Sequence, residues 1–93
     1  MYRVTVECQE VAQWLGDEAA ADIEREFREH RTWHYNPGCS FAAGILALTV
    51  ENDFDADGSA TLDEFADCIV AYIGEHGPIR VAGVAVTPRD TGR

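Results

Sequence analysis

The chain has 93 residues, a formal net charge of −10 and a hydrophobic content of 46%. This length allows one domain with a single modest core, and no apolar run approaches the roughly 20 residues of a membrane span. The negative charge excludes nucleic-acid backbones and anionic membranes as expected partners, because both would repel the protein.

Residues 2–8 alternate between apolar and polar side chains, which predicts a strand with one buried face. A helix is predicted over 17–31, with Gly16 and Asp17 at its N-terminal cap and acidic residues in its first turn. Its expected core face consists of Ala19, Ala20, Ile23 and Phe27.

The aromatic and β-branched segment 32–35 begins a second predicted strand. Asn36-Pro37-Gly38 interrupts this strand as a turn or an edge bulge, and residues 39–42 resume it. A turn at Ala43-Gly44 leads into a further strand over about 45–51.

An acidic loop follows, and Thr61 and Glu64 match a capping box (T-x-x-E) at the head of a second helix. The last predicted strand covers 79–87, with Gly83 marking a bulge, and 88–93 is expected to be a flexible tail of the single domain 1–93. The expected core face of the second helix consists of Leu62, Phe65, Ala66, Ile69, Val70 and Ile73.

The resulting order, β-α-β-β-α-β, resembles the ferredoxin-like architecture. The resemblance implies an α+β fold in which a four-stranded antiparallel sheet carries two helices on one face. Element order alone leaves the function open.

The loop 53–64 resembles an EF-hand calcium loop, since three alternating aspartates, a glycine and a final glutamate match D-x-D-x-D-G-x5-E. The resemblance implies Ca²⁺ as a cofactor, held by oxygen ligands on a tightly turning loop. Two features depart from it: Ala60 replaces the usual branched residue, and a strand, not a helix, is predicted before the loop. The alternative is that the aspartates stay solvated and cap the next helix. The candidate ligands are Asp53, Asp55, Asp57, Ser59, Thr61 and Glu64.

The charges are unevenly distributed along the chain. All seven basic residues are arginines, and none lies between Arg31 and Arg80, where eight acidic residues occur. A strongly negative surface suits a cation or a basic protein partner, although it also serves solubility. Exposed apolar side chains on the uncovered sheet face would favour a homodimer. The candidate partner-binding residues are Trp33, His34, Tyr35, Glu51, Asp63 and Asp67.

The three cysteines (Cys8, Cys39 and Cys68) are odd in number and have no metal-ligand spacing, so we expect reduced thiols. The N-terminus lacks a signal-peptide pattern, and we therefore expect a cytoplasmic protein.

Three functional hypotheses follow. The first is a non-catalytic interaction domain that binds a basic partner, and the second is a Ca²⁺-binding module. The third is a small dimeric enzyme, which would need His34 or His76 in a pocket beside a carboxylate. No catalytic residues are assigned, because no nucleophile and base stand together in the sequence.

Overall fold

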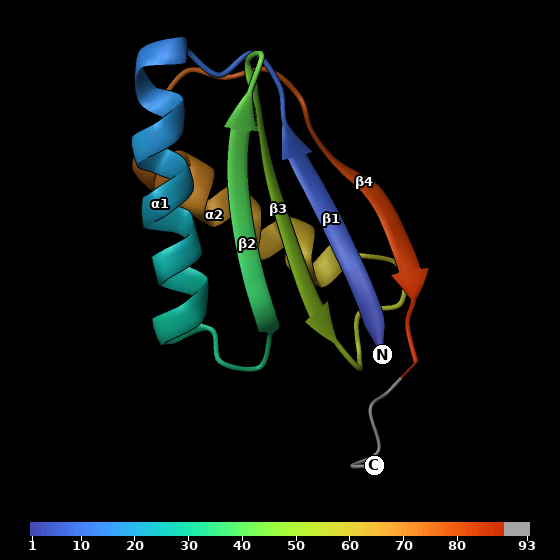
Figure 1. Cartoon of the computed structure of the whole chain (residues 1–93). Coiled ribbons are helices and arrows are strands. Elements are labelled where there is room, and N and C mark those ends of the chain that lie inside the picture. Colours follow the sequence, from blue (N-terminus) through green and yellow to red (C-terminus); the bar gives the residue numbers. More distant parts are fainter. Residues whose placement is uncertain (89–93) are drawn as a thin grey trace.

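The computed structural model describes residues 1–88 and contains six elements in the order β-α-β-β-α-β (Figure 1). The part of the expected tail that covers 89–93 lies outside the described residues. The elements are β1 (Tyr2–Cys8), α1 (Gln13–His30), β2 (Tyr35–Ala42), β3 (Ile45–Asn52), α2 (Ser59–Tyr72) and β4 (Ile79–Val86).

The four strands form one antiparallel sheet in the order β2-β3-β1-β4. This topology confirms the predicted ferredoxin-like α+β fold, and β3 is indeed the element that leads into the acidic loop. Among residues 1–88, neither helix combines the length and the apolar composition that crossing a bilayer requires.

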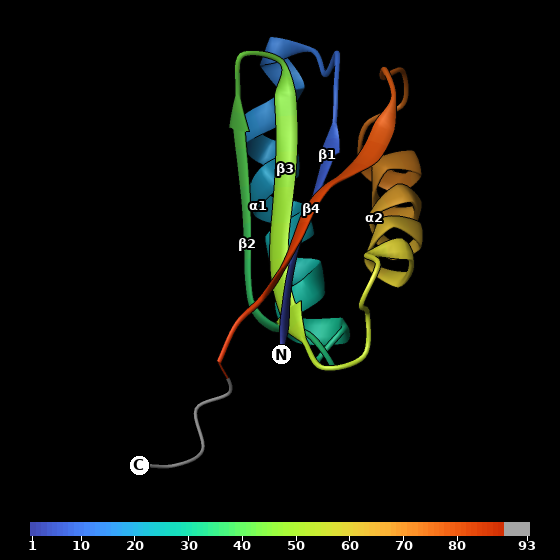
Figure 2. The ribbon, with the colours of Figure 1, turned by 90° about the vertical axis from the view of Figure 1, so that its right-hand side faces the viewer.

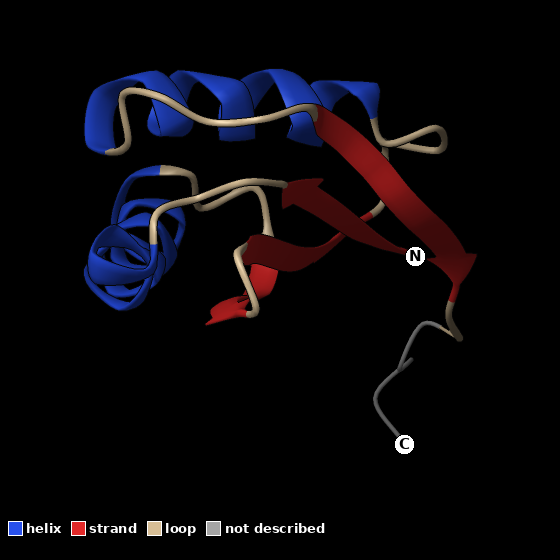
Figure 3. Cartoon of the chain, turned by 90° about the horizontal axis from the view of Figure 1, so that it is seen from above, coloured by secondary structure: helices blue, strands red, loops and turns tan. Residues whose placement is uncertain are grey.

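The core lies between the sheet and the two helices. Alternate side chains of β1 and β3 point to the same side, and the apolar faces of both helices close over them. Figure 2 shows the sheet nearly on edge with α2 on one side, and Figure 3 shows α1 end-on while α2 lies lengthwise. The helices therefore cross steeply, with α1 along β2 and β3 and α2 beneath β1 and β4. The largest buried side chains are Phe27, Phe65, Ile23, Leu46, Leu48 and Ile69.

The uncovered face of the sheet carries two ion pairs together with two exposed apolar side chains. Arg3 forms an ion pair with Glu51 at 3.0 Å, and Arg80 forms one with Glu7 at 3.0 Å. The valines of β1 and β3 point into the core instead. The exposed apolar side chains on this face are therefore Tyr35 and Ile45, and not the valines, which the strand periodicity places on the helix side.

Helix α1 begins earlier than the sequence predicted. Gly16 is a buried residue of its first turns and not part of its cap, which is formed at Ala12. The ring of Phe41 on β2 lies where a side chain at position 16 would stand, since a Cβ atom built there would be 2.2 Å from the ring. Glycine is needed here so that helix and strand can approach, a long-range reason that a local cap signal does not reveal.

Both predicted irregularities of the strands are confirmed. The register of β2 against β3 shifts between Tyr35 and Gly38, and the register of β4 shifts opposite Thr5 and Val6, next to Gly83. One predicted core residue of α2 was wrong: Val70 is 76% exposed, and Cys68 is buried on the inner face instead.

Candidate functional site: an aromatic and acidic corner

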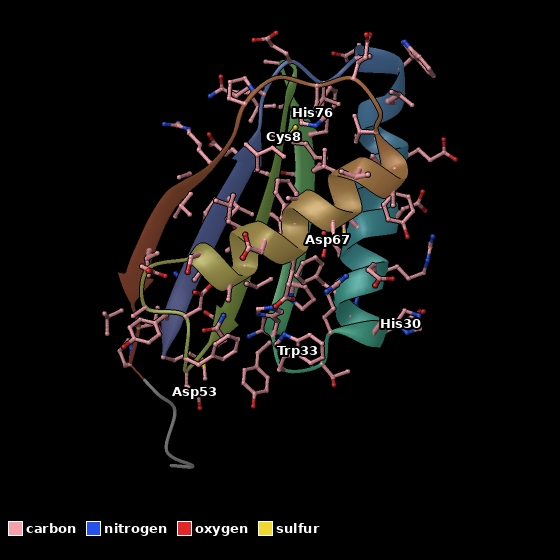
Figure 4. All side chains as sticks on the ribbon, turned by 180° about the vertical axis from the view of Figure 1, so that it is seen from behind. Cys8, His30, Trp33, Asp53, Asp67 and His76 are labelled. Carbon is pink, nitrogen blue, oxygen red and sulfur yellow. The ribbon has the colours of Figure 1, made fainter. Side chains whose placement is uncertain are left out.

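The candidate site is the corner where the α1–β2 connection meets the end of β3 and the first turns of α2. Trp33 and Asp53 lie at the same end of the molecule, and Asp67 lies on the outer side of α2 (Figure 4). We call Trp33, His34, Phe54 and Glu64 the aromatic–acidic corner.

The acidic loop is built around the N-terminus of α2. The carboxylate of Asp55 is buried and accepts hydrogen bonds from the backbone N–H groups of Ala60 (3.1 Å) and Thr61 (2.8 Å) and from the Thr61 hydroxyl. These are donors that a helix cannot satisfy internally at its first turn. Gly58 precedes the helix in the left-handed region with φ +79°. Asp55 thus caps α2, as the alternative interpretation of the loop expected, but it is buried and not solvated.

A second aspartate completes the capping. Asp57 accepts hydrogen bonds from the backbone N–H (3.0 Å) and the hydroxyl of Ser59. These bonds, the backbone one foremost, lower the pKa of the Asp57 carboxyl because they stabilise its charged form. The predicted capping box was wrong, since Thr61 bonds back to Asp55 and Glu64 turns toward His34.

Asn52, at the end of β3, connects the loop to His34. Its buried side-chain oxygen accepts the backbone N–H groups of Phe54 (3.2 Å) and Asp55 (2.9 Å). Its amide nitrogen therefore faces Nδ1 of His34 at 3.2 Å and must be the donor. Nδ1 then acts as an acceptor, so the ring hydrogen sits on Nε2.

The Nε2–H of His34 donates to Oε1 of Glu64 at 3.0 Å. The indole N–H of Trp33 donates to the other oxygen, Oε2, at 3.2 Å. Arg31 adds a positive charge 3.6 Å from Oε1 and also stacks over the ring of Phe27. A continuous chain of hydrogen bonds thus runs from the loop backbone through Asn52, His34 and Glu64 to the indole of Trp33.

The rings at the corner enclose the imidazole of His34. The ring centroid of His34 lies 5.4 Å from Phe27, 6.0 Å from Trp33 and 5.8 Å from Phe54. His34 has no exposed side-chain surface, whereas Trp33 and Phe54 are 48% and 50% exposed. The corner therefore presents two aromatic surfaces over a buried polar support.

The six candidate calcium ligands do not share one orientation. Asp55 and Thr61 are buried and bonded to each other, Ser59 donates to Asp57, and Glu64 faces His34 and Trp33. Asp53 and Asp57 are exposed. Within residues 1–88, no group of three or more His, Cys, Asp or Glu residues is arranged to hold a metal ion. Calcium binding at this loop stays a prediction.

The candidate partner-binding residues divide into three groups. Trp33 and His34 belong to the corner, while Asp63 and Asp67 are exposed on α2. Tyr35 on β2 lies directly opposite Glu51 on β3. Both line a hollow of about 520 Å³, together with Met1, Arg3, Asn36 and Thr87. Hydrogen bonds from Asn36 and then Arg3 lower the pKa of Glu51.

The enzyme hypothesis required a histidine beside a carboxylate in a pocket. His34 does lie beside Glu64, but its imidazole is fully enclosed and offers no surface to a substrate. His76 is exposed and lines a shallow hollow with Glu10 and Glu75. Neither arrangement includes a neighbouring nucleophile.

The outer face of α2 lacks basic residues. Each arginine of residues 1–88 lies within 4.0 Å of a carboxylate. Among these ion pairs, only the one between Arg31 and Glu64 involves α2. No described arginine reaches Asp63 or Asp67. Within residues 1–88, no side chain therefore neutralises the negative charge of Asp63 and Asp67 through an ion pair.

Sequence reasoning missed Asn52, Phe54 and the role of Glu64. An asparagine directly after a strand is a known local signal for a turn in which its side chain accepts backbone N–H groups. The pairing of Glu64 with His34 has no such signal, because the two residues are distant in sequence. Comparison of the chain with known protein families, with curated proteins and with solved structures gives no match.

Proposed function

We propose that this protein is a non-catalytic interaction domain that binds a basic segment of a partner protein. The binding surface is the aromatic–acidic corner together with the outer face of α2. The observation that carries the proposal is the half-exposed indole of Trp33, which donates a hydrogen bond to Glu64 on the helix that also carries the exposed Asp63 and Asp67.

A fixed, exposed tryptophan suits an anchor of a protein interface. Trp is enriched among the residues that dominate binding energy, and a side chain already held in its bound position loses little entropy on association. Here the hydrogen-bond chain through Asn52, His34 and Glu64 removes rotational freedom from the indole before any partner arrives.

The partner's charge follows from the surroundings of the anchor. Asp63 and Asp67 attract cations along α2, and the faces of Trp33 and Phe54 favour a guanidinium or ammonium group stacked over them. Complementary charge accelerates encounter and improves selectivity more than it adds affinity. A segment rich in arginine or lysine meets both requirements.

The proposal extends to location. The thiols of Cys8, Cys39 and Cys68 are free, and burial raises the pKa of each, that of Cys39 to about 12. Unreactive thiols of this kind support a cytoplasmic location, where they remain reduced.

The test uses a fluorescently labelled deca-arginine peptide and measures its binding by anisotropy at several salt concentrations. We expect salt-sensitive binding that Trp33→Ala weakens by about tenfold or more. The double variant Asp63→Asn/Asp67→Asn should weaken binding several-fold at low salt and less at high salt.

The matched control is Glu18→Gln/Glu29→Gln, which removes the same charge from exposed positions of α1. We expect this control to bind the peptide like the unmodified protein. Equal weakening by both double variants would show that only net charge matters, and the proposal of a localised surface would be rejected. Absence of binding at low salt would reject it as well.

A further inference from the structure

The two edges of the sheet are protected to different degrees. At the β2 edge, the backbone N–H of Cys39 donates to the carboxylate of Glu24 on α1 at 3.0 Å. Helix α1 also packs closely on this strand, where Gly16 contacts Phe41. The β2 edge is thus covered by the protein itself.

β4 forms the other edge of the sheet, and within residues 1–88 no helix side chain bonds its backbone as Glu24 bonds that of Cys39. Thr87 and Met1 exchange backbone hydrogen bonds of 2.8 and 3.4 Å across the β4–β1 ladder. Hydrogen-bonded positions alternate along an antiparallel pair, so Ala85 also bonds toward β1. The N–H and C=O groups of Val84 and Val86 therefore point outward, away from the sheet.

The side chains along this edge are small or apolar. From 81 to 86 the sequence is Val-Ala-Gly-Val-Ala-Val, without a charged residue or a proline, and Val86 is 78% exposed. Natural sheets normally protect an exposed edge with charges, prolines or cover from another element. The register shift next to Gly83 separates 79–81, which contains the charged Arg80, from the regular and uncharged segment 84–86.

We propose that the β4 edge pairs in antiparallel fashion with the β4 strand of a second copy of this chain. In the register that pairs the outward N–H and C=O groups, Val84 faces Val86 of the second copy and the two-fold axis passes beside Ala85. Both Val84–Val86 pairs then use the outward groups, and each pair exchanges two backbone hydrogen bonds. The interface is isologous and closed, as most homodimer interfaces are.

Charge favours a second copy at this edge over other parts of the surface. Two chains of net charge −10 repel each other, but β4 carries no acidic residue. Its one charged residue, Arg80, is paired with Glu7. On the adjacent strand β1, Arg3 lies opposite Ala85 and is paired with Glu51 of β3. The self-pairing places no like charges opposite each other. Because two short strands bury less than about 1,000 Å², the dimer should be weak and concentration-dependent.

The experiment is sedimentation velocity over a concentration series that extends into the millimolar range. We expect the mean mass of the unmodified chain to rise toward that of a dimer. Val84→Pro removes an outward N–H donor without touching the ladder to β1, and Val86→Lys places a charge on the edge. Both variants should remain monomeric throughout the series.

The matched control is Val70→Lys on α2, because Val70 and Val86 are almost equally exposed. This variant should dimerise like the unmodified chain. Amide hydrogen exchange adds a readout specific to the register: Val84 and Val86 should gain protection at high concentration, and Ala85 should be protected at every concentration.

A chain that stays monomeric over the whole series would overturn the proposal. A dimer that forms without new protection of Val84 and Val86, or that survives Val86→Lys, would also overturn it in favour of another interface. Neither result depends on the binding of a basic peptide, so this proposal and the proposed function fail separately.

Discussion

Asp55 and Asp63 belong to the same acidic stretch but have opposite environments. Asp55 is buried and accepts three hydrogen bonds from the first turn of α2, whereas Asp63 is exposed on the outside of the same helix. Glu64, the next residue along, turns inward and supports His34 and Trp33. The loop and inner carboxylates therefore hold the backbone and the corner in place, and the outer carboxylates are exposed to solvent. Acidic composition alone does not separate these two roles.

The largest expected effect is on the free energy of unfolding, to which Asp55 should contribute far more than Asp63. Asp55→Ala leaves the N–H groups of Ala60 and Thr61 and the Thr61 hydroxyl without their acceptor. Loss of a cap and burial of unsatisfied donors should together lower the free energy of unfolding by about 3 kcal/mol. Urea unfolding measures the change as a lower midpoint. Asp63→Ala is the control and should stay within about 0.5 kcal/mol of the unmodified protein. Equal losses in both variants would contradict the division drawn here.

A smaller effect should follow from breaking the inner hydrogen-bond chain at Asn52. Asn52→Ala leaves Nδ1 of His34 and the N–H groups of Phe54 and Asp55 unpaired, which should cost about 2 kcal/mol. It should also loosen the indole of Trp33, because His34 no longer orients Glu64. Lower fluorescence anisotropy of Trp33, measured with Trp14→Phe so that one tryptophan remains, would report this.

The same experiment separates two roles for the buried hydrogen bonds through Asn52, His34 and Glu64. If the unfolding midpoint falls and the anisotropy of Trp33 stays unchanged, these hydrogen bonds stabilise the acidic loop but do not hold the indole of Trp33 in place. The binding surface would then not be preorganised by these hydrogen bonds, while the acidic loop would still cap α2.

Local signals were sufficient for the fold and insufficient for the site. The alternation in 2–8 and the interruption at Asn36-Pro37-Gly38 act within a few residues, so the strands and their bulges were predictable. Gly16 was misassigned because its requirement comes from Phe41, on another element. Glu64 was misassigned as the partner of Thr61 in a capping box for the same reason, since its contacts are with His34 and Trp33. Spacing within a loop cannot show which carboxylates the fold itself uses.

The smallest expected effect is that of calcium on thermal stability, and it tests the division of carboxylates directly. The EF-hand resemblance of 53–64 predicts a higher melting temperature with millimolar Ca²⁺, because a ligand that binds only the folded state stabilises it. Asp55, however, is occupied by the helix N-terminus, and Glu64 by His34 and Trp33. Recruiting both for Ca²⁺ would break the cap and the corner together. We therefore expect melting curves with Ca²⁺ and with a chelator to coincide. A rise that Asp53→Asn abolishes would show that the loop rearranges around the ion, and the distinction between inner and outer carboxylates would then depend on calcium.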